Sequence, residues 1–188
     1  MGSGVSGLYS GTYGSIAAGG AGGNRNATAS SSDSSGGSQE YSAQYSVVKR
    51  MHERDKKDSA IWSDDSGYYK NPSAANIEEC ANGSSIVYEG RKANGKMTYV
   101  VDTKGNLIFG KRDNPINPKT RSPHPMLIGG KDPQVRIAGM IEFRGGKIFA
   151  IDNDSGHYRP PAKSLEAAEE ALSRLPKEVF HKDSKWRN

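Results

Sequence analysis

The sequence contains a single cysteine, Cys80, among its 188 residues. One thiol cannot form an intramolecular disulfide, and zinc sites with four cysteine ligands are excluded. No apolar run reaches about 18 residues, the length that a membrane-spanning helix needs. No basic start is followed by an apolar stretch, so we expect neither a membrane span nor a cleaved signal peptide.

Hydrophobic residues are also scarce, at 34% of the chain, and the shortage is greatest at the N-terminus. The first 46 residues contain 11 glycines and 12 serines but only three charged side chains. Such a segment buries too little apolar surface to offset the entropy that it would lose on ordering. We therefore expect a disordered tail over residues 1–46, a helical arm over 47–83 and one α+β domain over 84–188.

Within the arm, helical spacing of apolar residues predicts a charged helix over residues 47–58, capped by Ser46. A second short helix is predicted between residues 71 and 82, ending at a glycine. Trp62 and Tyr68 lie between the two helices, and we expect these aromatic side chains to attach the arm to the main body.

Beyond residue 84 the pattern changes to strands. Short β-branched and aromatic runs predict strands at 85–89, 96–102, 107–110, 135–143 and 147–152. Ser164 is then expected to cap a helix that ends at Leu175. The order predicts the α+β class: short N-terminal helices, an antiparallel sheet of about five strands and a C-terminal helix.

The clearest strand pattern lies just before the Gly145-Gly146 pair, which predicts a two-residue hairpin loop. Apolar or small residues occupy every second position of this segment: Val135, Ile137, Gly139, Ile141 and Phe143. Alternation at period two is typical of a strand with one buried face, so we expect this strand at the centre of the core.

Two kinds of ligand site are excluded by spacing. Gly90–Lys96 has the glycine and lysine spacing of a phosphate-binding loop, but Met97 stands where the magnesium-binding hydroxyl belongs. The histidines show no H-x-E or HExxH spacing, so we expect no metal and no cofactor.

The main candidate site is the segment Ser155–Pro160, which follows a buried strand. His157 can transfer protons near neutral pH, and Ser155 can act as a nucleophile or a hydrogen-bond donor. Tyr158 adds a ring face and a hydroxyl, and Arg159 has the planar guanidinium that suits phosphate. The alternative interpretation is a structural corner whose polar groups bond the backbone.

His124 is a second candidate because prolines on both sides restrict its backbone. The predicted hairpin returns the chain to the level where its first strand begins. We therefore expect His124 and His157 to meet in one pocket, where they could act as acid and base without metal.

Basic residues surround this candidate site. Between Lys111 and Lys147 there are eight Lys or Arg and three Asp or Glu, an excess equal to the net charge of +5 of the whole chain. Such a stripe fits an anionic partner such as RNA or a nucleotide, and the alternative is a solvated basic surface. The residues that we expect to bind substrate are Lys111, Arg112, Arg121 and Lys131.

Four segments, taken in order, resemble one recurring domain: His124–Gly130, Ala138-Gly139, Gly146–Ile148 and Ser155–Pro160. The set resembles domains near the C-termini of bacterial polymorphic-toxin and effector proteins. It is also similar to the C-terminal half of the plant IQ-motif-containing calmodulin-binding family. The resemblance covers residues 86–160 and implies a site at His124, Ser155, His157, Tyr158 and Arg159.

The chain departs from these families at two positions. Pro125 stands where relatives often carry serine, and Met140 where bacterial relatives often carry glutamate. No IQ motif is present, so calmodulin binding is not implied.

Two functions of different class remain open. The first is a toxin-type effector that acts on RNA or a nucleotide as a metal-independent ribonuclease or a nucleotide-using transferase. This function implies a cognate immunity protein, and a location in the bacterial cytoplasm or delivery to a target cell without a cleaved signal. The second is a non-catalytic ligand- or protein-binding module that uses the corner from Ser155 to Tyr158.

Overall fold

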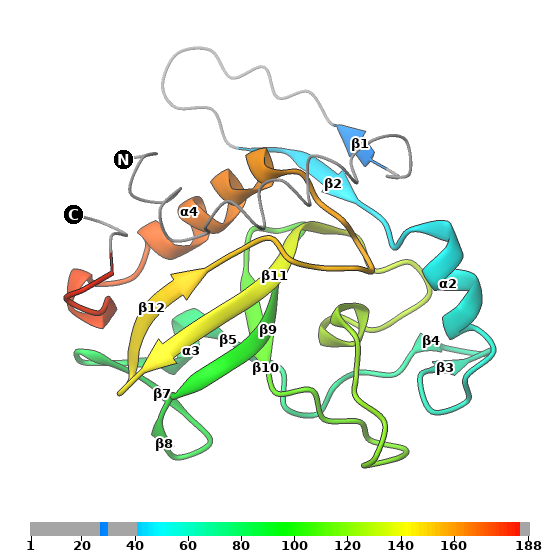
Figure 1. Ribbon diagram of the computed structural model, residues 1–188, viewed down its shortest axis with the longest axis horizontal. Helices are drawn as coiled ribbons and strands as arrows, with labels where there is room; N and C mark the ends of the chain where they lie inside the picture. Colours follow the sequence, from blue (N-terminus) through cyan, green and yellow to red (C-terminus); the bar gives the residue numbers. More distant parts are fainter. Residues whose placement is uncertain (1–26, 30–40, 185–188) are drawn as a thin grey trace.

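The computed structural model describes residues 27–29 and 41–184 (Figure 1). Most of the predicted tail therefore lies outside the described residues. The elements in chain order are β1 (Ala27–Ala29), β2 (Ala43–Tyr45), α2 (Lys49–Asp55), β3 (Trp62–Ser63), β4 (Gly67–Tyr68), β5 (Ala75–Asn76), α3 (Ile77–Cys80), β6 (Ala81–Asn82), β7 (Ser85–Tyr88), β8 (Arg91–Lys92), β9 (Gly95–Asp102), β10 (Leu107–Gly110), η1 (His124–Leu127), β11 (Val135–Arg144), β12 (Lys147–Ile151), η2 (Ala162–Ser164), α4 (Leu165–Ser173) and η3 (Lys177–Val179).

The fold is α+β, as the sequence predicts, with one main antiparallel sheet. Among the described residues this sheet has seven strands in the order β1-β2-β11-β9-β10-β5, with β12 also paired to β11. The expected strand over 85–89 is β7, which lies in a separate three-stranded sheet with β6 and β8, so four of the five expected strands are in the main sheet. The short strands β1, β2 and β5 bring the total to seven. β9 lies between β10 and β11, so the long segment after β10 carries the chain past β9.

The ten-residue strand β11 is the centre of the sheet. It pairs with β9 along its length, with β12 near its end and with β2 at its first residue. The predicted inward residues Val135, Ile137, Gly139, Ile141 and Phe143 are all buried, which confirms the period-two pattern. The helix α4 packs against β9, β10 and β11 (Figure 1).

We expect Ile141→Ala to lower the free energy of unfolding by about 2–4 kcal/mol, because this fully buried side chain would leave a cavity. Arg144→Ala, at the exposed end of the same strand, should change stability by less than about 0.5 kcal/mol. Urea unfolding of both variants measures the difference. Equal losses would mean that the burial pattern of β11 is not what stabilises it.

The N-terminal arm differs from its prediction in three places. Ordered structure begins before residue 46, because β2 pairs with β11 and Tyr45 is buried. Residue 48, rather than Ser46, precedes α2, and it makes no side-chain capping bond. The segment with Trp62 and Tyr68 is a β-hairpin, and both rings are buried, as expected for an attachment point.

The second predicted helix is reduced to the single turn α3, which Asn76 caps through the Glu78 backbone N–H. Residues 71–73 do not start it, since their polar groups bond the long segment after β10. At the other end of the chain, Ser164 bonds Pro161 instead of capping α4.

Candidate functional site

The residues Ser155 to Tyr158 form an interior corner after β12. Ser155, His157 and Tyr158 are each less than 10% exposed. The Ser155 hydroxyl lies 3.2 Å from His124 Nδ1 and also accepts a bond from the Tyr158 backbone N–H. The Tyr158 hydroxyl donates to the Pro133 carbonyl at 2.6 Å. The polar groups of the corner are thus directed at the protein's own interior.

His124 is equally buried, at 5% exposure, and both of its ring nitrogens are engaged. Nε2 donates to the Gly139 carbonyl at 2.8 Å, because a carbonyl can only accept; Nδ1 is left to accept the Ser155 hydroxyl. Burial, with smaller contributions from Arg112 and His157, lowers the pKa of His124 to about 3. The ring is therefore neutral over the physiological range.

The structure brings His124 and His157 to the same corner, with Ser155 bonded to one and two residues from the other. Because both rings are buried, contact with a substrate would require the corner to open. The catalytic roles of His124, Ser155, His157 and Tyr158 stay predictions.

His157 connects the corner to the N-terminal arm through a buried carboxylate. Asp55, at the end of α2, is 1% exposed, and its Oδ2 accepts from His157 Nε2 at 2.8 Å and from the Tyr68 hydroxyl at 2.7 Å. Burial and the bond to Asp55 raise the pKa of Tyr68. The Val48 N–H donates to the His157 carbonyl at 2.8 Å. The corner therefore holds both ends of α2 in position.

His52, three residues before Asp55 on α2, presents a different environment. The His52 ring stacks on the Tyr68 ring, with 5.9 Å between the ring centroids. It packs edge to face against the Trp62 ring, with 5.2 Å between the centroids. Its Nε2 is buried, with no hydrogen-bond partner of normal geometry among the described residues. Burial and the Lys56 charge lower the pKa of His52, against the opposing effects of Asp132, Asp55 and a hydrogen bond with the Lys131 backbone. At neutral pH this half-buried ring is thus uncharged, and a substrate would reach its buried Nε2 only if the surrounding side chains moved.

A cavity of about 290 Å³ opens beside His52, between the start of α2 and the segment before β11. Two exposed lysines, Lys49 and Lys131, line it, together with one carboxylate, Asp132. The complete lining is Ser46, Val47, Lys49, His52, Lys131, Asp132 and Pro133, which we call the His52 pocket. Of the predicted substrate-binding residues, Lys131 lies here.

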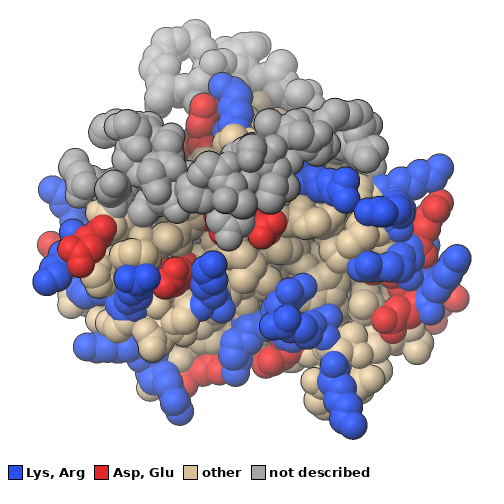
Figure 2. Space-filling view, viewed as in Figure 1, with Lys and Arg blue, Asp and Glu red and all other residues tan. Residues whose placement is uncertain are grey.

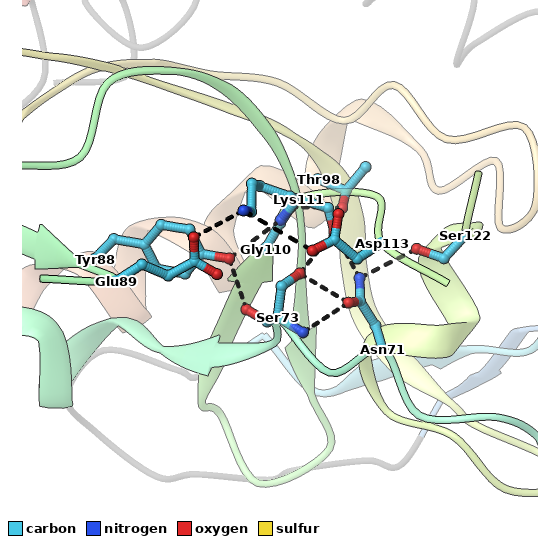
Figure 3. Close-up of polar contacts among 9 residues, drawn as sticks. All are labelled: Asn71, Ser73, Tyr88, Glu89, Thr98, Gly110, Lys111, Asp113 and Ser122. Atoms are coloured by element: carbon cyan, nitrogen blue, oxygen red, sulfur yellow. Dashed lines mark hydrogen bonds and ion pairs between the residues drawn. The ribbon is translucent and has the colours of Figure 1, made fainter. Parts of the chain in front are cut away.

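The other predicted substrate-binding residues lie on the segment after β10. Lys111 is not a free cation, because its Nζ lies 2.7 Å from a Glu89 carboxylate oxygen and 3.9 Å from one of Asp113 (Figure 3). The bond to Glu89 raises the pKa of Lys111. Its backbone carbonyl accepts from Asn71 and Ser73, which anchors the start of the segment (Figure 3).

Arg112 and Arg121 lie close enough for their charges to interact: burial, and secondarily Arg121, lower the pKa of Arg112. Arg112 Nε donates to the Ser122 carbonyl, so part of its guanidinium is used within the fold. On the face shown in Figure 2, basic side chains are interspersed with acidic ones and form no single continuous patch.

Arg159, the last predicted catalytic residue, has a backbone φ of 45°. A non-glycine residue pays a steric cost in this left-handed region, and the bond from its N–H to the Ser155 carbonyl holds it there. This geometry closes the corner after Tyr158. Arg159 does not line the His52 pocket.

Sequence reasoning missed His52, Asp55 and Tyr68 as members of this constellation. One signal was available: His52 and Asp55 are three residues apart, which places both on one face of the predicted helix. The charged neighbours of His52 instead indicated an exposed segment. Only the tertiary structure shows that the hairpin with Trp62 and Tyr68 covers this face.

Within the described residues, no group of three or more His, Cys, Asp or Glu side chains is arranged to hold a metal ion. No helix in the described part of the chain is long and apolar enough to cross a membrane. Comparisons of the chain with protein-family models, with curated proteins and with solved structures find no match.

Proposed function

We propose that this chain is an effector-type domain, of the kind found near the C-termini of bacterial polymorphic toxins, that acts on a phosphate-bearing substrate such as RNA or a nucleotide. The reaction is assigned to the His52 pocket. The observation that carries the proposal is a cavity that two lysines line together with the neutral imidazole of His52. The resemblance of residues 86–160 to toxin-type domains supports the biological class.

The residues that line the pocket fit two roles, phosphate binding and proton transfer. Lys49 and Lys131 supply the positive charge that attracts and holds a phosphate group. A ribose 2′-hydroxyl that reaches His52 as the pocket opens gives its proton to the imidazole while the hydroxyl oxygen bonds to phosphorus. The bond from phosphorus to the 5′-oxygen breaks at the same time, and the departing 5′-oxygen takes a proton from water. The negative charge of Asp132 weakens the binding of an anion, and it also stabilises the protonated form of His52 after the transfer.

The buried corner has a supporting role in this proposal. Asp55 accepts from both His157 and Tyr68, and Tyr68 stacks on His52. The corner thereby fixes the ring that His52 packs on. A domain of this type would act inside a target cell and be neutralised by a cognate immunity protein, and both statements belong to the proposal.

A non-catalytic binding module is the second candidate. The observation that favours it is the burial of Ser155, His157 and Tyr158, which leaves His52 as the only imidazole among the residues lining the pocket. Such a module would bind an anionic ligand in the same pocket without converting it.

The test uses a labelled single-stranded RNA, with binding and cleavage measured separately. We expect His52→Gln to reduce cleavage by about 100-fold or more, the usual effect of losing a general base, with binding changed less than about threefold. Lys49→Gln combined with Lys131→Gln should weaken binding at low salt, and the deficit should shrink as salt screens the charges. Lys111→Gln is the matched control, because Glu89 and Asp113 already neutralise that charge.

The outcomes separate the two candidates. Cleavage that depends on His52 supports the enzyme, whereas binding that depends on the two lysines without any cleavage supports the binding module. If the wild-type protein neither binds nor cleaves the RNA, or if Lys111→Gln is as defective as the double variant, the pocket is not the site. Growth arrest on expression in a bacterial cytoplasm, lost in His52→Gln, would support the toxin class.

A further inference from the structure

A second cavity, of about 80 Å³, lies between α4 and the turn that joins β9 to β10. Three basic side chains line it, those of Lys104, Arg136 and Arg174, together with one carboxylate, Glu170. The remaining lining residues are Gly105 and Ala167, and we call this set the Arg136 cavity. It shares no residue with the His52 pocket.

A hydrogen bond fixes the Arg136 guanidinium, but its Nε–H donor has no acceptor among the described residues. Its Nη2 donates to the Thr103 carbonyl at 2.7 Å, which fixes the guanidinium against the turn. Its Nε is buried and has no hydrogen-bond partner, and no carboxylate of the described residues forms an ion pair with Arg136. An unpartnered buried donor is costly, and the cost is larger for a charged group. This donor has no acceptor among the residues that the structure describes.

The opposite wall of the cavity is also rigid. Arg174 Nη2 donates to the Gly105 carbonyl at 2.7 Å, while its Nε pairs with Glu78. The turn itself is closed by Asp102, whose Oδ1 accepts from the Lys104 and Asn106 backbone N–H groups. Two guanidinium groups thus hold one turn from two sides, and the cavity is formed before any ligand arrives.

The charges around the cavity favour an anion. Glu78 balances Arg174, whereas the Glu170 carboxylate accepts from the Tyr41 backbone N–H and keeps its negative charge, which offsets part of the remaining positive charge. Lys104, exposed on the turn, and Arg136 then remain as cations without an ion-pair partner among the described residues. A planar guanidinium with a free N–H is well suited to bind a tetrahedral oxyanion.

We infer that the Arg136 cavity binds a phosphate group, with the Arg136 guanidinium and Lys104 as the two cations that hold it. A cavity of about 80 Å³ accommodates a single phosphate and excludes a nucleoside. The phosphate can be free inorganic phosphate or the terminal group of a monoester, and both present the same oxygen atoms. This inference does not depend on the proposed function.

Calorimetric titration of the full chain with inorganic phosphate, and separately with phosphoserine, tests the site at constant ionic strength. We expect saturable binding of inorganic phosphate, weakened at least tenfold in Arg136→Gln and in Lys104→Gln. Lys104 is an exposed turn residue, so this second variant should fold even if Arg136→Gln does not. Glu170→Gln should tighten binding, because it removes the carboxylate that faces the anion.

Arg144→Gln is the matched control, since Arg144 lies at the other end of β11 and pairs with Glu142. It should bind phosphate like the wild-type protein. Binding of phosphoserine as well as phosphate identifies the terminal group of a monoester as a ligand, and binding of phosphate alone identifies the free ion. The inference is overturned if phosphate binds no better than chloride, or if Arg144→Gln loses as much affinity as Lys104→Gln.

Discussion

Gly139→Ala should lower the free energy of unfolding by about 3 kcal/mol or more, the largest loss that we expect from adding one methyl group to this chain. The new Cβ would lie 2.0 Å from the Asp152 carbonyl oxygen and 2.7 Å from its carbon. Both are backbone atoms, so no side-chain rotation can relieve the overlap. Denaturant unfolding followed by circular dichroism measures the loss.

The segment that Gly139 contacts cannot move away cheaply. The Tyr99 hydroxyl donates to the Asp152 carbonyl at 2.7 Å, and the Asp152 N–H donates to the Met140 carbonyl at 3.0 Å. The Asp152 Oδ1 atom also accepts from the Met140 and Asp154 backbone N–H groups. Shifting this segment would break several of these bonds in the interior.

Gly156→Ala is the control, because a Cβ at Gly156 meets no atom within 4 Å and its φ lies outside the left-handed region. That variant should be neutral or slightly stabilised, through the lower entropy of its unfolded state. A small loss in Gly139→Ala would show that residues 152–153 are free to lift from β11. Similar losses in both variants would mean that the close approach at Gly139 is not the cause.

The contacts of Gly139 bring together three of the four segments on which the predicted resemblance rests. His124 bonds the Gly139 carbonyl and Ser155, and Gly139 leaves room for the chain that leads into Ser155. Three of the four segments therefore meet in one buried unit where the chain after β12 crosses β11. The residues of this unit first stabilise a crossing, whatever further role they have.

The strands were predictable because their patterns are local. Alternation along residues 135–143 and the Gly145-Gly146 turn both depend on neighbours in sequence, and both are confirmed. The environment of His52 was not predictable in this way. It depends on Trp62 and Tyr68 from a hairpin, and on Asp55, which bonds His157 about 100 residues away. No local pattern encodes contacts of that range.

The same limit applies to charge. The sequence indicates that Lys111 and Lys131 belong to one basic stripe, because it counts charges along the chain. The fold neutralises Lys111 with Glu89, which is 22 positions earlier, and leaves Lys131 at a cavity. A count of basic residues therefore predicts the sign of the field, whereas the ion pairs decide which cations are available to a ligand.

The buried side chains of His124 and Asp152 should change the stability of the fold in opposite directions as the pH is lowered. The pKa of His124 falls from 6.5 to about 3 on folding, so between these values only the unfolded chain binds the proton. Lowering the pH through this range therefore destabilises the fold by up to about 5 kcal/mol, at about 1.4 kcal/mol per pH unit.

Burial raises the pKa of Asp152 from 3.8 to about 6, so the folded chain binds that proton first. Lowering the pH from 6 to 3.8 then stabilises the fold by up to about 3 kcal/mol.

Because the two effects have opposite signs, they should nearly cancel between about pH 4 and pH 6, and Asp152→Asn should expose the contribution of His124. Asparagine keeps the Oδ1 that accepts from Met140 and Asp154, and it removes the charge that burial disfavours. We expect the variant to exceed the wild-type protein in stability by up to about 3 kcal/mol at pH 7, to match it near pH 4, and to lose stability steeply between these values. His124→Gln should show the reverse, a gain in stability relative to the wild-type protein on acidification from pH 6 to pH 4, because Asp152 then titrates without the opposing effect of His124. Urea unfolding at a series of pH values measures all three proteins, and other titrating groups cancel in the differences between them. An Asp152→Asn variant that is no more stable than the wild-type protein at pH 7 would show that the carboxylate is better solvated than its burial indicates.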